Sequence, residues 1–269
     1  MGNPFFYPKL INLYPLKRVI ITGAGSGLGL ELVKLLLQDG WKICAIDMNT
    51  SELEIIKTPA LFLHQQDITN RDYFRKIIEG FCEQHQGVDI LFNNAGVGEG
   101  SFFKDYAPEN WDFIININLK AVIEGTHFVL PFMLKSNTGS IVNMASMAGI
   151  ANLPKMSPYN VTKAAVISLS ETLTHELSKT NIRVICVMPT FFKSSIMQHS
   201  KGDSTIVASA TEIVSNSRLT SKEAADIILR NLHKRKEVLR FPFSANLFFY
   251  SRRFFPALFK KAVRSFLMK

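Results

Sequence analysis

The sequence lacks any uninterrupted apolar run near the roughly 20 residues that a membrane-spanning helix needs. Its first residues also lack the charged start and apolar core of a secretory signal. Cysteine is scarce, and the three that occur lie far apart among apolar neighbours, without metal-ligand spacing (Cys44, Cys82 and Cys186). We therefore expect a cytoplasmic protein with reduced, buried thiols and no metal site.

Acidic side chains are scarce in one part of the chain. Residues 231–269 contain ten Lys or Arg and a single acid, Glu237, whereas residues 1–230 contain 21 bases and 21 acids. The formal net charge of +9 therefore belongs to the C-terminal segment. A composition of 47% apolar and 20% charged residues over 269 residues fits one large globular domain.

Short β-branched runs alternate with longer amphipathic segments along the chain. The expected strands cover residues 17–23, 42–47, 60–66, 88–94, 139–146, 182–189 and 237–241. The expected helices cover residues 27–39, 70–85, 111–135, 159–179 and 222–234. This alternation predicts an α/β fold with a Rossmann-like, doubly wound parallel sheet of about seven strands, whose ligands bind at the carboxyl ends of the strands.

No linker interrupts this pattern, so we expect a single catalytic domain over residues 1–240 and a basic, aromatic, helical tail over residues 241–269. Residues 194–221 are rich in Ser and Thr and carry few core signals, which predicts a mobile loop within a substrate-binding segment of about 190–221. The sequence TSKE at 220–223 resembles a capping box and predicts the start of a helix there.

The first expected strand ends in a glycine-rich sequence, TGAGSGLG, at residues 22–29. The common G-x-G-x-x-G pattern would need glycine at 28, where leucine stands, and the spacing runs instead through Gly23, Gly27 and Gly29. Such a turn lets backbone N–H groups approach a pyrophosphate and lets the next helix pack closely on the strand. Glycine-rich turns also follow strands in proteins that bind no nucleotide, so this motif does not decide the function alone.

Asp47 closes the second expected strand. A carboxylate there can accept hydrogen bonds from both hydroxyls of an adenosine ribose and would repel a 2′-phosphate. Met48 and Asn49 follow, so no arginine stands beside it to bind that phosphate. The position favours NAD over NADP, and the alternative is an aspartate that merely starts a turn.

Tyr159 and Lys163 stand four residues apart in a segment expected to be helical, so both lie on one face. A free tyrosine, with a pKa near ~10, is a poor base at neutral pH. A neighbouring ammonium favours the phenolate, so we expect Lys163 to lower the pKa of Tyr159 toward about 7. Taken alone, such a pair is more often two solvent-exposed side chains on a helix surface with no catalytic role.

The order of the motifs points further than any one of them. The chain reads TGAGSGLG, Asp47, QDIT (66–69), NNAG (93–96), WDFIININLKA (111–121), GSIVNMAS (139–146) and SPYNVTKAA (157–165). Over residues 17–190 this sequence resembles the short-chain dehydrogenase/reductase family of NAD type. Ser146 precedes Tyr159 by 13 residues, the interval typical of that family, and Asn118 matches its asparagine.

The resemblance implies a proton relay made of four catalytic residues. Tyr159 would exchange a proton with the substrate oxygen, and Ser146 would donate a hydrogen bond to it. Lys163 would also hold the nicotinamide ribose, and Asn118 would anchor a water that links Lys163 to solvent. The implied cofactor-binding residues are Gly23, Ser26, Gly27, Leu28, Gly29, Asp47, Met48, Asp67, Ile68, Asn94, Ala95, Gly96, Tyr159, Lys163, Pro189, Thr190 and Phe191.

The sequence departs from the family after the sixth expected strand, where Pro189-Thr190 stands in place of the usual Pro-Gly. Losing the glycine costs backbone freedom, but Thr190 and Phe191 are still expected near the nicotinamide carboxamide. The adjacent Phe191 and Phe192 suggest an apolar site. Whether Ser194 replaces the family's carboxamide-binding threonine stays open.

The tail leaves three interpretations open. After Pro256, helical spacing places apolar residues on one face and Lys260, Lys261 and Arg264 off it. The apolar residues are Leu258, Phe259, Ala262, Val263, Phe266 and Leu267. This face could lie on an anionic membrane, or pack on the protein body or a second subunit. Nucleic-acid binding is a third, less favoured interpretation.

The sequence as a whole predicts an oxidoreductase that uses NAD, with NADP less favoured, to interconvert a secondary alcohol and a ketone on a small apolar substrate. One alternative is an NAD-responsive binding or scaffold protein whose tail contacts a membrane or partner. Another is an NADP-dependent 3-oxoacyl-type reductase, which Asp47 disfavours. Similar enzymes are commonly homodimers or homotetramers built through the helices at 111–135 and 159–179, so we expect a cytoplasmic homo-oligomer, with any peripheral membrane contact confined to its tail.

Overall fold

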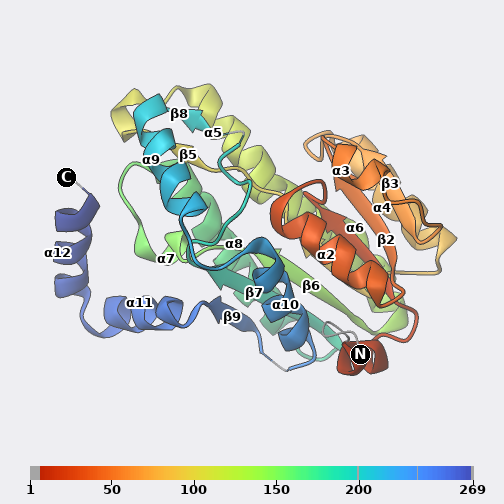
Figure 1. Ribbon diagram of the computed structural model, residues 1–269. Coiled ribbons are helices and arrows are strands. Elements are labelled where there is room, and N and C mark those ends of the chain that lie inside the picture. Colours follow the sequence, from red (N-terminus) through yellow and green to blue (C-terminus); the bar gives the residue numbers. More distant parts are fainter. Residues whose placement is uncertain (1–6, 199, 235, 268–269) are drawn as a thin grey trace.

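A seven-stranded parallel sheet forms the centre of the protein, in a computed structural model that describes residues 7–198, 200–234 and 236–267 (Figure 1). The strand order is β3-β2-β1-β4-β6-β7-β9, and each neighbouring pair runs parallel. The strands are β1 (Arg18–Thr22), β2 (Lys42–Asp47), β3 (Leu61–Gln65), β4 (Ile90–Asn93), β6 (Gly139–Met144), β7 (Ile182–Pro189) and β9 (Val238–Phe241). The predicted Rossmann-like α/β fold and its seven strands are confirmed.

Helices cover both faces of the sheet because successive strand residues point to opposite sides. Val19 and Ile21 of β1 pack in one buried cluster with α2 and α10, whereas Ile20 packs in another with α4 and α6. A third cluster joins α8 to β7. These helices are α2 (Gly27–Gln38), α4 (Arg71–Gln84), α6 (Ala121–Ser136), α8 (Ser157–Glu176) and α10 (Ser221–Leu232).

The capping box predicted at 220–223 is present at the start of α10. The Thr220 hydroxyl accepts a hydrogen bond from the Glu223 N–H, and the Glu223 carboxylate accepts one from the Thr220 N–H. Two backbone donors that the helix leaves unpaired are satisfied in this way. Short elements elsewhere in the chain include α3 (Ser51–Glu54), a 3-10 turn (Phe103–Asp105) and α7 (Ala148–Ala151).

The helix expected over 111–135 is a longer run with an interruption. It consists of α5 (Pro108–Ile115), a π-helical turn (Asn116–Lys120) and α6, which together span 29 residues and contain an 18-residue window of mean hydropathy 1.3. By length and composition alone such a helix could cross a membrane, although the sequence contains no uninterrupted apolar run. Here α6 packs against α4 and β4, as the core helix of a globular domain does.

The segment before β1 contains a helix that the periodicity analysis did not predict, α1 (Pro8–Leu13). Its neighbours Tyr7 and Tyr14 are buried with Leu10 in the core cluster on the α2 face. The Tyr14 hydroxyl lies 2.5 Å from the Ser140 hydroxyl at the start of β6. Six residues are too few to show a hydrophobic period, so tertiary packing rather than a local pattern defines this helix.

The prediction of a loop over 194–221 was wrong for part of that range. Residues 201–202 form β8 (Lys201–Gly202), which pairs with β5 (Glu99–Gly100), and α9 follows (Ser204–Ser215). The Asp203 carboxylate caps α9 by accepting hydrogen bonds from the Thr205 and Ile206 N–H groups. The many serine and threonine residues weaken the hydrophobic pattern of this segment, so the helix was not predicted. Its start is set by one capping aspartate.

Two helices make up the tail, α11 (Phe243–Phe254) and α12 (Pro256–Leu267). Helix α11 follows β9 and packs against β9 and α7, and α12 packs against α11 at one end of the molecule (Figure 1). Of the apolar face predicted for α12, Phe259 is buried and Val263 is half-buried, but Leu258 and Ala262 are exposed. The side chains of Phe266 and Leu267 lie outside the described part.

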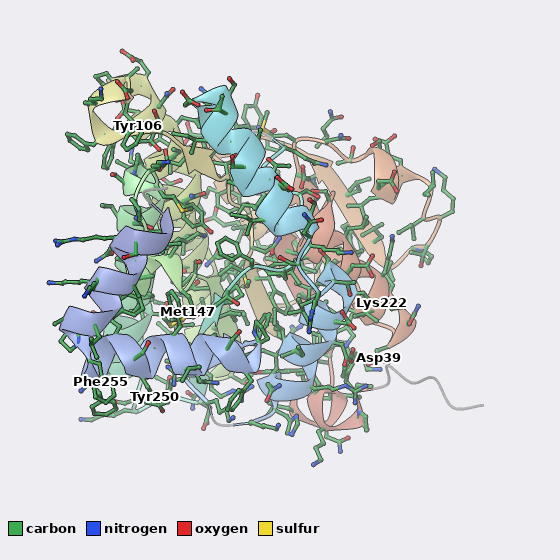
Figure 2. The ribbon with its side chains drawn as sticks, turned by 60° about the vertical axis from the view of Figure 1, so that its left-hand side comes forward. Asp39, Tyr106, Met147, Lys222, Tyr250 and Phe255 are labelled. Carbon is green, nitrogen blue, oxygen red and sulfur yellow. The ribbon has the colours of Figure 1, made fainter. Side chains whose placement is uncertain are left out.

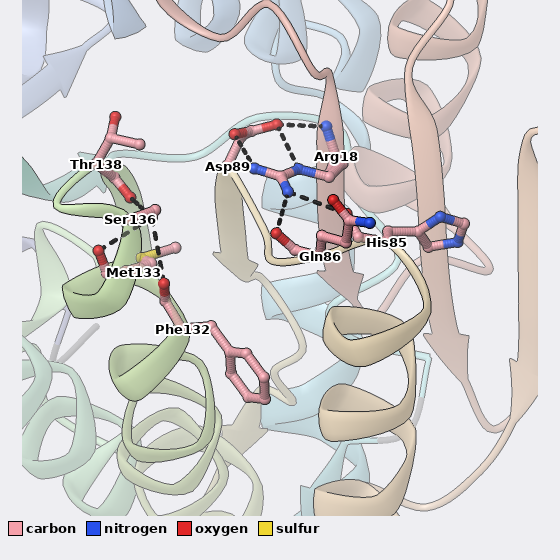
Figure 3. Close-up of polar contacts among 8 residues, drawn as sticks. All are labelled: Arg18, His85, Gln86, Asp89, Phe132, Met133, Ser136 and Thr138. Carbon is pink, nitrogen blue, oxygen red and sulfur yellow. Dashed lines mark hydrogen bonds and ion pairs between the residues drawn. The ribbon is translucent and has the colours of Figure 1, made fainter.

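A buried ion pair joins the amino end of β1 to the turn before β4 (Figure 3). The Arg18 guanidinium donates to both carboxylate oxygens of Asp89, at 3.1 and 2.8 Å, and Asp89 also accepts from the Arg18 N–H. The remaining Arg18 donor reaches the His85 and Gln86 carbonyls. Both side chains are almost fully buried, so each depends on the other for its charge compensation.

Candidate active site

The glycine-rich turn between β1 and α2 leaves no room for larger side chains. Gly23 has a φ of +65°, and a Cβ there would lie 2.7 Å from the Ala95 Cα. A Cβ at Gly29 would lie 2.0 Å from the Gly23 carbonyl oxygen. Helix α2 begins at Gly27, and its N-cap Ser26 makes no side-chain capping bond. The turn therefore brings bare backbone to the carboxyl end of the sheet.

The NNAG segment is tied to this turn by side-chain amides. The Asn94 Nδ2 donates to the carbonyl oxygens of Thr22 and Gly23, both at 3.0 Å. The Thr22 hydroxyl accepts the N–H groups of Asn94 and Ala95, each at 3.1 Å. One strand over, the Asn93 amide donates to Asn143 of β6 at 2.8 Å. These bonds fix the ends of β1, β4 and β6 relative to one another.

Asp47 lies at the carboxyl end of β2, next to the glycine-rich turn. One carboxylate oxygen accepts the Gly25 N–H at 2.8 Å and the other accepts the Asn49 N–H at 2.9 Å. Met48 is largely exposed beside it. The carboxylate is therefore held in a fixed position where solvent can reach it. A ligand hydroxyl could donate to it there, which it could not do to a buried aspartate.

Asp67 and Ile68 follow β3 in the same edge of the sheet. The Asp67 carboxylate accepts hydrogen bonds from the N–H and hydroxyl of Thr69, both at 2.8 Å. Ile68 is buried in the cluster beneath α4. The Gln66 N–H donates to the Asp47 carbonyl, so this turn is joined to the end of β2.

Asn118 lies in the π-helical turn between α5 and α6 and is fully buried. Its side-chain oxygen accepts the Val97 N–H and its Nδ2 donates to the Val97 carbonyl, each at 2.9 Å. The side-chain amide thus binds backbone that follows NNAG, so any water it anchors must use another of its atoms. Single π turns inside α-helices frequently mark functional positions.

Tyr159 and Lys163 lie one turn apart near the start of α8, and both are buried. The Lys163 Nζ donates to the Met144 carbonyl at 2.7 Å, at the carboxyl end of β6, and lies 5.6 Å from the centre of the Tyr159 ring. A Cβ on Gly96 would come within 3.5 Å of that nitrogen and 3.3 Å of the Asn118 side-chain oxygen. Lys163, Asn118 and NNAG therefore share one small space.

Burial controls the protonation of this pair. It raises the pKa of Tyr159 to about 12, and a hydrogen bond with Ser146 pulls the pKa only partly back. Burial also lowers the pKa of Lys163 to about 8. The prediction that Lys163 makes the phenol acidic is therefore wrong for the protein alone, because its ammonium is turned to the Met144 carbonyl and desolvation of the phenolate dominates.

Ser146 follows β6, and its hydroxyl accepts the Ala148 N–H at 3.1 Å. The next residue, Met147, donates its N–H to the Pro189 carbonyl at the end of β7. Thr190 then donates its N–H to the Phe241 carbonyl of β9, and its φ is not positive. The glycine usual in the family is therefore not required by the backbone at this position.

The segment after β7 passes over the glycine-rich turn. Phe191 is 45% exposed, whereas Phe192 packs against the core and lies 6.5 Å from the Phe241 ring. A Cβ on Gly27 would lie 3.2 Å from the Ser195 N and 3.8 Å from the Ser194 Cα. Ser195, which the sequence analysis did not single out, thus lies nearer to the start of α2 than Ser194 does.

Glu99 is a buried carboxyl that the sequence analysis missed. Its Oε1 accepts the Tyr159 N–H at 2.6 Å, in the first turn of α8, where the N-cap Met156 offers no side-chain cap. Glu99 therefore caps the helix that carries Tyr159 from a distant part of the chain. Burial raises its pKa to about 7, and the bonds from Tyr159 and Tyr106 oppose that rise. Its isolation in the apolar run VGEGSFF was the available signal.

Replacing Glu99 by glutamine should stabilise the protein above neutral pH. Because the folded-state pKa of about 7 lies above the ordinary 4.5, the stability contributed by the neutral carboxyl is full below 4.5 and is lost as pH rises to about 7. Glutamine stays neutral and can still accept the Tyr159 N–H. In urea unfolding, the free energy of unfolding of Glu99→Gln should exceed that of wild type by about 2–3 kcal/mol at about pH 8 and should differ little from it at about pH 5. The exposed Glu109→Gln is the control, and equal differences at both pH values would contradict the assignment.

The three cysteines are core residues of β2, α4 and β7. Cys44, Cys82 and Cys186 are buried and unpaired, as predicted, and burial raises the pKa of the Cys82 and Cys186 thiols to about 12. Within residues 7–198, 200–234 and 236–267, no group of three or more His, Cys, Asp or Glu side chains could hold a metal ion.

The residues present fit a dinucleotide. At Gly23 and Gly29 a Cβ would collide with backbone atoms, so the turn stays free of side chains, and α2 begins beside it with no side-chain cap on its first N–H groups. Asp47 offers carboxylate oxygens at the neighbouring strand end. A side chain at Gly96 would crowd the Asn118 oxygen and the Lys163 Nζ, so glycine keeps the backbone bare at the point where a flat ring would lie.

Comparison with known proteins gives consistent matches. Residues 17–205 match the family described as short chain dehydrogenase. A 3-oxoacyl-[acyl-carrier-protein] reductase of Thermotoga maritima is 34% identical over 188 residues, which cover 68% of this chain and 76% of that protein. A short-chain dehydrogenase/reductase from Burkholderia phymatum, solved in complex with NAD, is 25% identical with a TM-score of 0.80, over 88% of this chain and 92% of that one. A serine dehydrogenase complexed with NADP+ is 27% identical with a TM-score of 0.75, over 84% and 95% of the two chains.

Proposed function

This chain belongs to the short-chain dehydrogenase family of oxidoreductases, and from that membership we propose that it uses NAD to interconvert a secondary alcohol and a ketone on an apolar substrate. The observation that carries the proposal is the position of Tyr159 and Lys163. They are buried one turn apart, beside Ser146, at the edge of the sheet where the glycine-rich turn lies.

Proton transfer falls to Tyr159. In reduction its phenol gives a proton to the substrate oxygen while the carbonyl carbon receives a hydride, so C=O becomes C–OH. The bound nicotinamide supplies that hydride and accepts it in oxidation. A phenol with a pKa of about 12 is protonated at neutral pH, which is the form that reduction needs. Ser146, hydrogen-bonded to the same phenol, donates to the substrate oxygen and stabilises its developing charge.

Lys163 and Asn118 support this transfer. Lys163 stands between the Met144 carbonyl and the Tyr159 ring, so its ammonium can hold ribose hydroxyls and favour the phenolate once the proton has left. Asn118 clamps Val97 and so holds the NNAG backbone against Lys163. The residues that would hold the dinucleotide are those named from the sequence, from Gly23 to Phe191, along the carboxyl ends of the strands.

Asp47 favours NAD over NADP in this proposal. The known structures similar to this chain include one with NAD and one with NADP+, so the choice depends on this chain's own residues. Asp47→Asn keeps an oxygen for the Gly25 N–H but removes the charge that would repel a 2′-phosphate. We expect wild type to bind NADH at least about tenfold more tightly than NADPH. In Asp47→Asn, this ratio of affinities should be about tenfold smaller.

Fluorescence titration with both cofactors measures this ratio for wild type, Asp47→Asn and the exposed control Asp72→Ala. A wild-type protein that prefers NADPH would overturn the choice of NAD. An unchanged ratio in Asp47→Asn would show that this carboxylate does not read the ribose.

Substrate class is open to a direct screen. The exposed Phe191 after β7 supports an apolar alcohol or ketone, whereas the Thermotoga maritima relative favours a 3-oxoacyl thioester as the second candidate. Secondary alcohols with NAD, and ketones and 3-oxoacyl thioesters with NADH or NADPH, can be followed by absorbance of the reduced cofactor. Turnover of the thioester alone, with NADPH, would favour the second candidate.

A scaffold that only responds to NAD would bind the cofactor and turn over none of these compounds. We further propose that the protein is a cytoplasmic homodimer or homotetramer, assembled through the helical surfaces of 111–135 and 159–179. Light scattering of the purified protein measures the mass of the oligomer and so tests this proposal.

A further inference from the structure

Helix α11 carries an apolar stripe that faces away from the protein. Phe243, Leu247, Tyr250 and Phe254 recur at the spacing of one helical face, and each is between 47% and 86% exposed. Leu258, 67% exposed, continues the row into α12. Figure 2 shows Tyr250 and Phe255 at the lower edge of the molecule, on α11 and at its junction with α12. We call this row of five residues, 243, 247, 250, 254 and 258, the outer stripe.

The opposite face of α11 holds the helix on the body. Ala245 is fully buried, and the Phe248 ring packs edge-on against Phe259 of α12, with ring centres 4.9 Å apart. The Arg240 guanidinium of β9 lies over the Phe249 ring at 4.3 Å and donates to the Asn246 side chain. The tail is therefore anchored, so the outer stripe is not the face that packs on the body.

Cationic side chains accompany the outer stripe. Lys260, Lys261 and Arg264 are exposed on α12, and Arg253 is exposed on α11. A hollow of about 310 Å³ lies between α12 and the turn after α7, with Arg252 on its wall. The Arg252 Nη1 is buried there without a hydrogen-bond partner. The tail contains no acid after Glu237 to balance these charges.

We propose that α11 and α12 form a docking surface for an anionic phospholipid bilayer. The outer stripe would enter the interfacial region, where aromatic side chains are favoured, while the bases meet lipid phosphates and anionic headgroups. A second copy of the chain is the weaker occupant. A twofold contact through this face would bring the bases of two tails together, with no acids between them.

The geometry also relates this surface to the active site. Helix α7, which packs against α11, follows Ser146 directly in the chain. A bilayer bound to α11 and α12 would therefore lie on the same side of the protein as the loop that carries Ser146. The inference about lipid binding does not depend on the proposed reaction, since it rests on the tail alone.

Vesicle flotation of the full-length protein tests the proposal with two triple variants. One removes three residues of the outer stripe (F243S, L247S and F254S), and the other removes three charges (K260Q, K261Q and R264Q). Control variants of the same chemistry lie elsewhere on the surface (L16S, I55S and Y73S; K57Q, K135Q and K179Q). All altered positions are exposed, and circular dichroism checks that each variant is folded.

The wild type should bind vesicles that contain about 30% phosphatidylserine at least about tenfold more than pure phosphatidylcholine, with binding weakened by salt. Both tail variants should lose about tenfold, and both controls should bind like wild type. Equal loss in the controls, or unchanged binding in the tail variants, would overturn the proposal. A wild-type protein that does not bind vesicles would also overturn it. In that case, a changed oligomeric mass in the stripe variant would indicate a second copy of the chain as the occupant, and binding of a single-stranded oligonucleotide would indicate a nucleic acid.

Discussion

Replacing Tyr159 by phenylalanine should lower turnover by about 10³–10⁴-fold while leaving the affinity for NADH within a factor of about three. The hydroxyl is the only group removed, and it is the group that we propose gives the proton to the substrate oxygen. Its neighbours cannot take its place. The Lys163 ammonium is directed to the Met144 carbonyl, and the Ser146 hydroxyl can donate a hydrogen bond to the substrate oxygen but is too weak an acid to give up its proton.

The fold should tolerate this change, because the buried ring that α8 carries at this position is kept. Steady-state kinetics and NADH fluorescence on the same preparations separate chemistry from binding. Tyr73→Phe, an exposed residue of α4, is the control for losing a phenolic hydroxyl. Turnover within tenfold of wild type in Tyr159→Phe would remove Tyr159 from the proton relay. A matching loss of NADH affinity would indicate a role in binding instead.

Replacing Asp89 by alanine should destabilise the protein by about 3–5 kcal/mol. The change leaves the Arg18 guanidinium buried with only the His85 and Gln86 carbonyls as partners, as Figure 3 shows. It also removes the acceptor of the Arg18 N–H at the amino end of β1. The cost comes mainly from the uncompensated charge rather than from the value of the pair itself.

Two further variants separate these contributions in urea unfolding. The exposed pair Arg75–Glu79 has the same 2.8 Å separation, and Glu79→Ala should leave the unfolding midpoint almost unchanged. The double change Arg18→Met with Asp89→Leu should cost less than Asp89→Ala alone, because neither charge is left buried. Equal effects of Asp89→Ala and Glu79→Ala would show that burial of the pair does not matter.

The fold was largely predictable because parallel strands buried on both faces appear as continuous apolar runs. The seven strands from β1 to β9 are each within two residues of their expected bounds. Helix α1 was missed because its six residues are specified by burial of Tyr7 and Tyr14, contacts made with distant parts of the chain. Helix α9 was missed because its signal was one capping aspartate, Asp203, in a polar sequence.

The candidate site was predictable in its members but not in its electrostatics. Spacing along α8 identified Tyr159 and Lys163, since the helical period fixes which residues share a face. The pKa values depend on burial and on the direction of the Lys163 ammonium, which no local pattern reveals. Glu99 was missed for a similar reason, because it acts on Tyr159 from 60 residues away.

The proposed reaction needs one cleft that holds a dinucleotide beside a protonated phenol. Calorimetric titration of NADH into wild type and Tyr159→Phe tests this most directly. One NADH should bind per chain in both proteins, with similar affinity, and a ketone added afterwards should be reduced only by wild type. No binding at about millimolar NADH, or reduction at equal rates by both proteins, would contradict it.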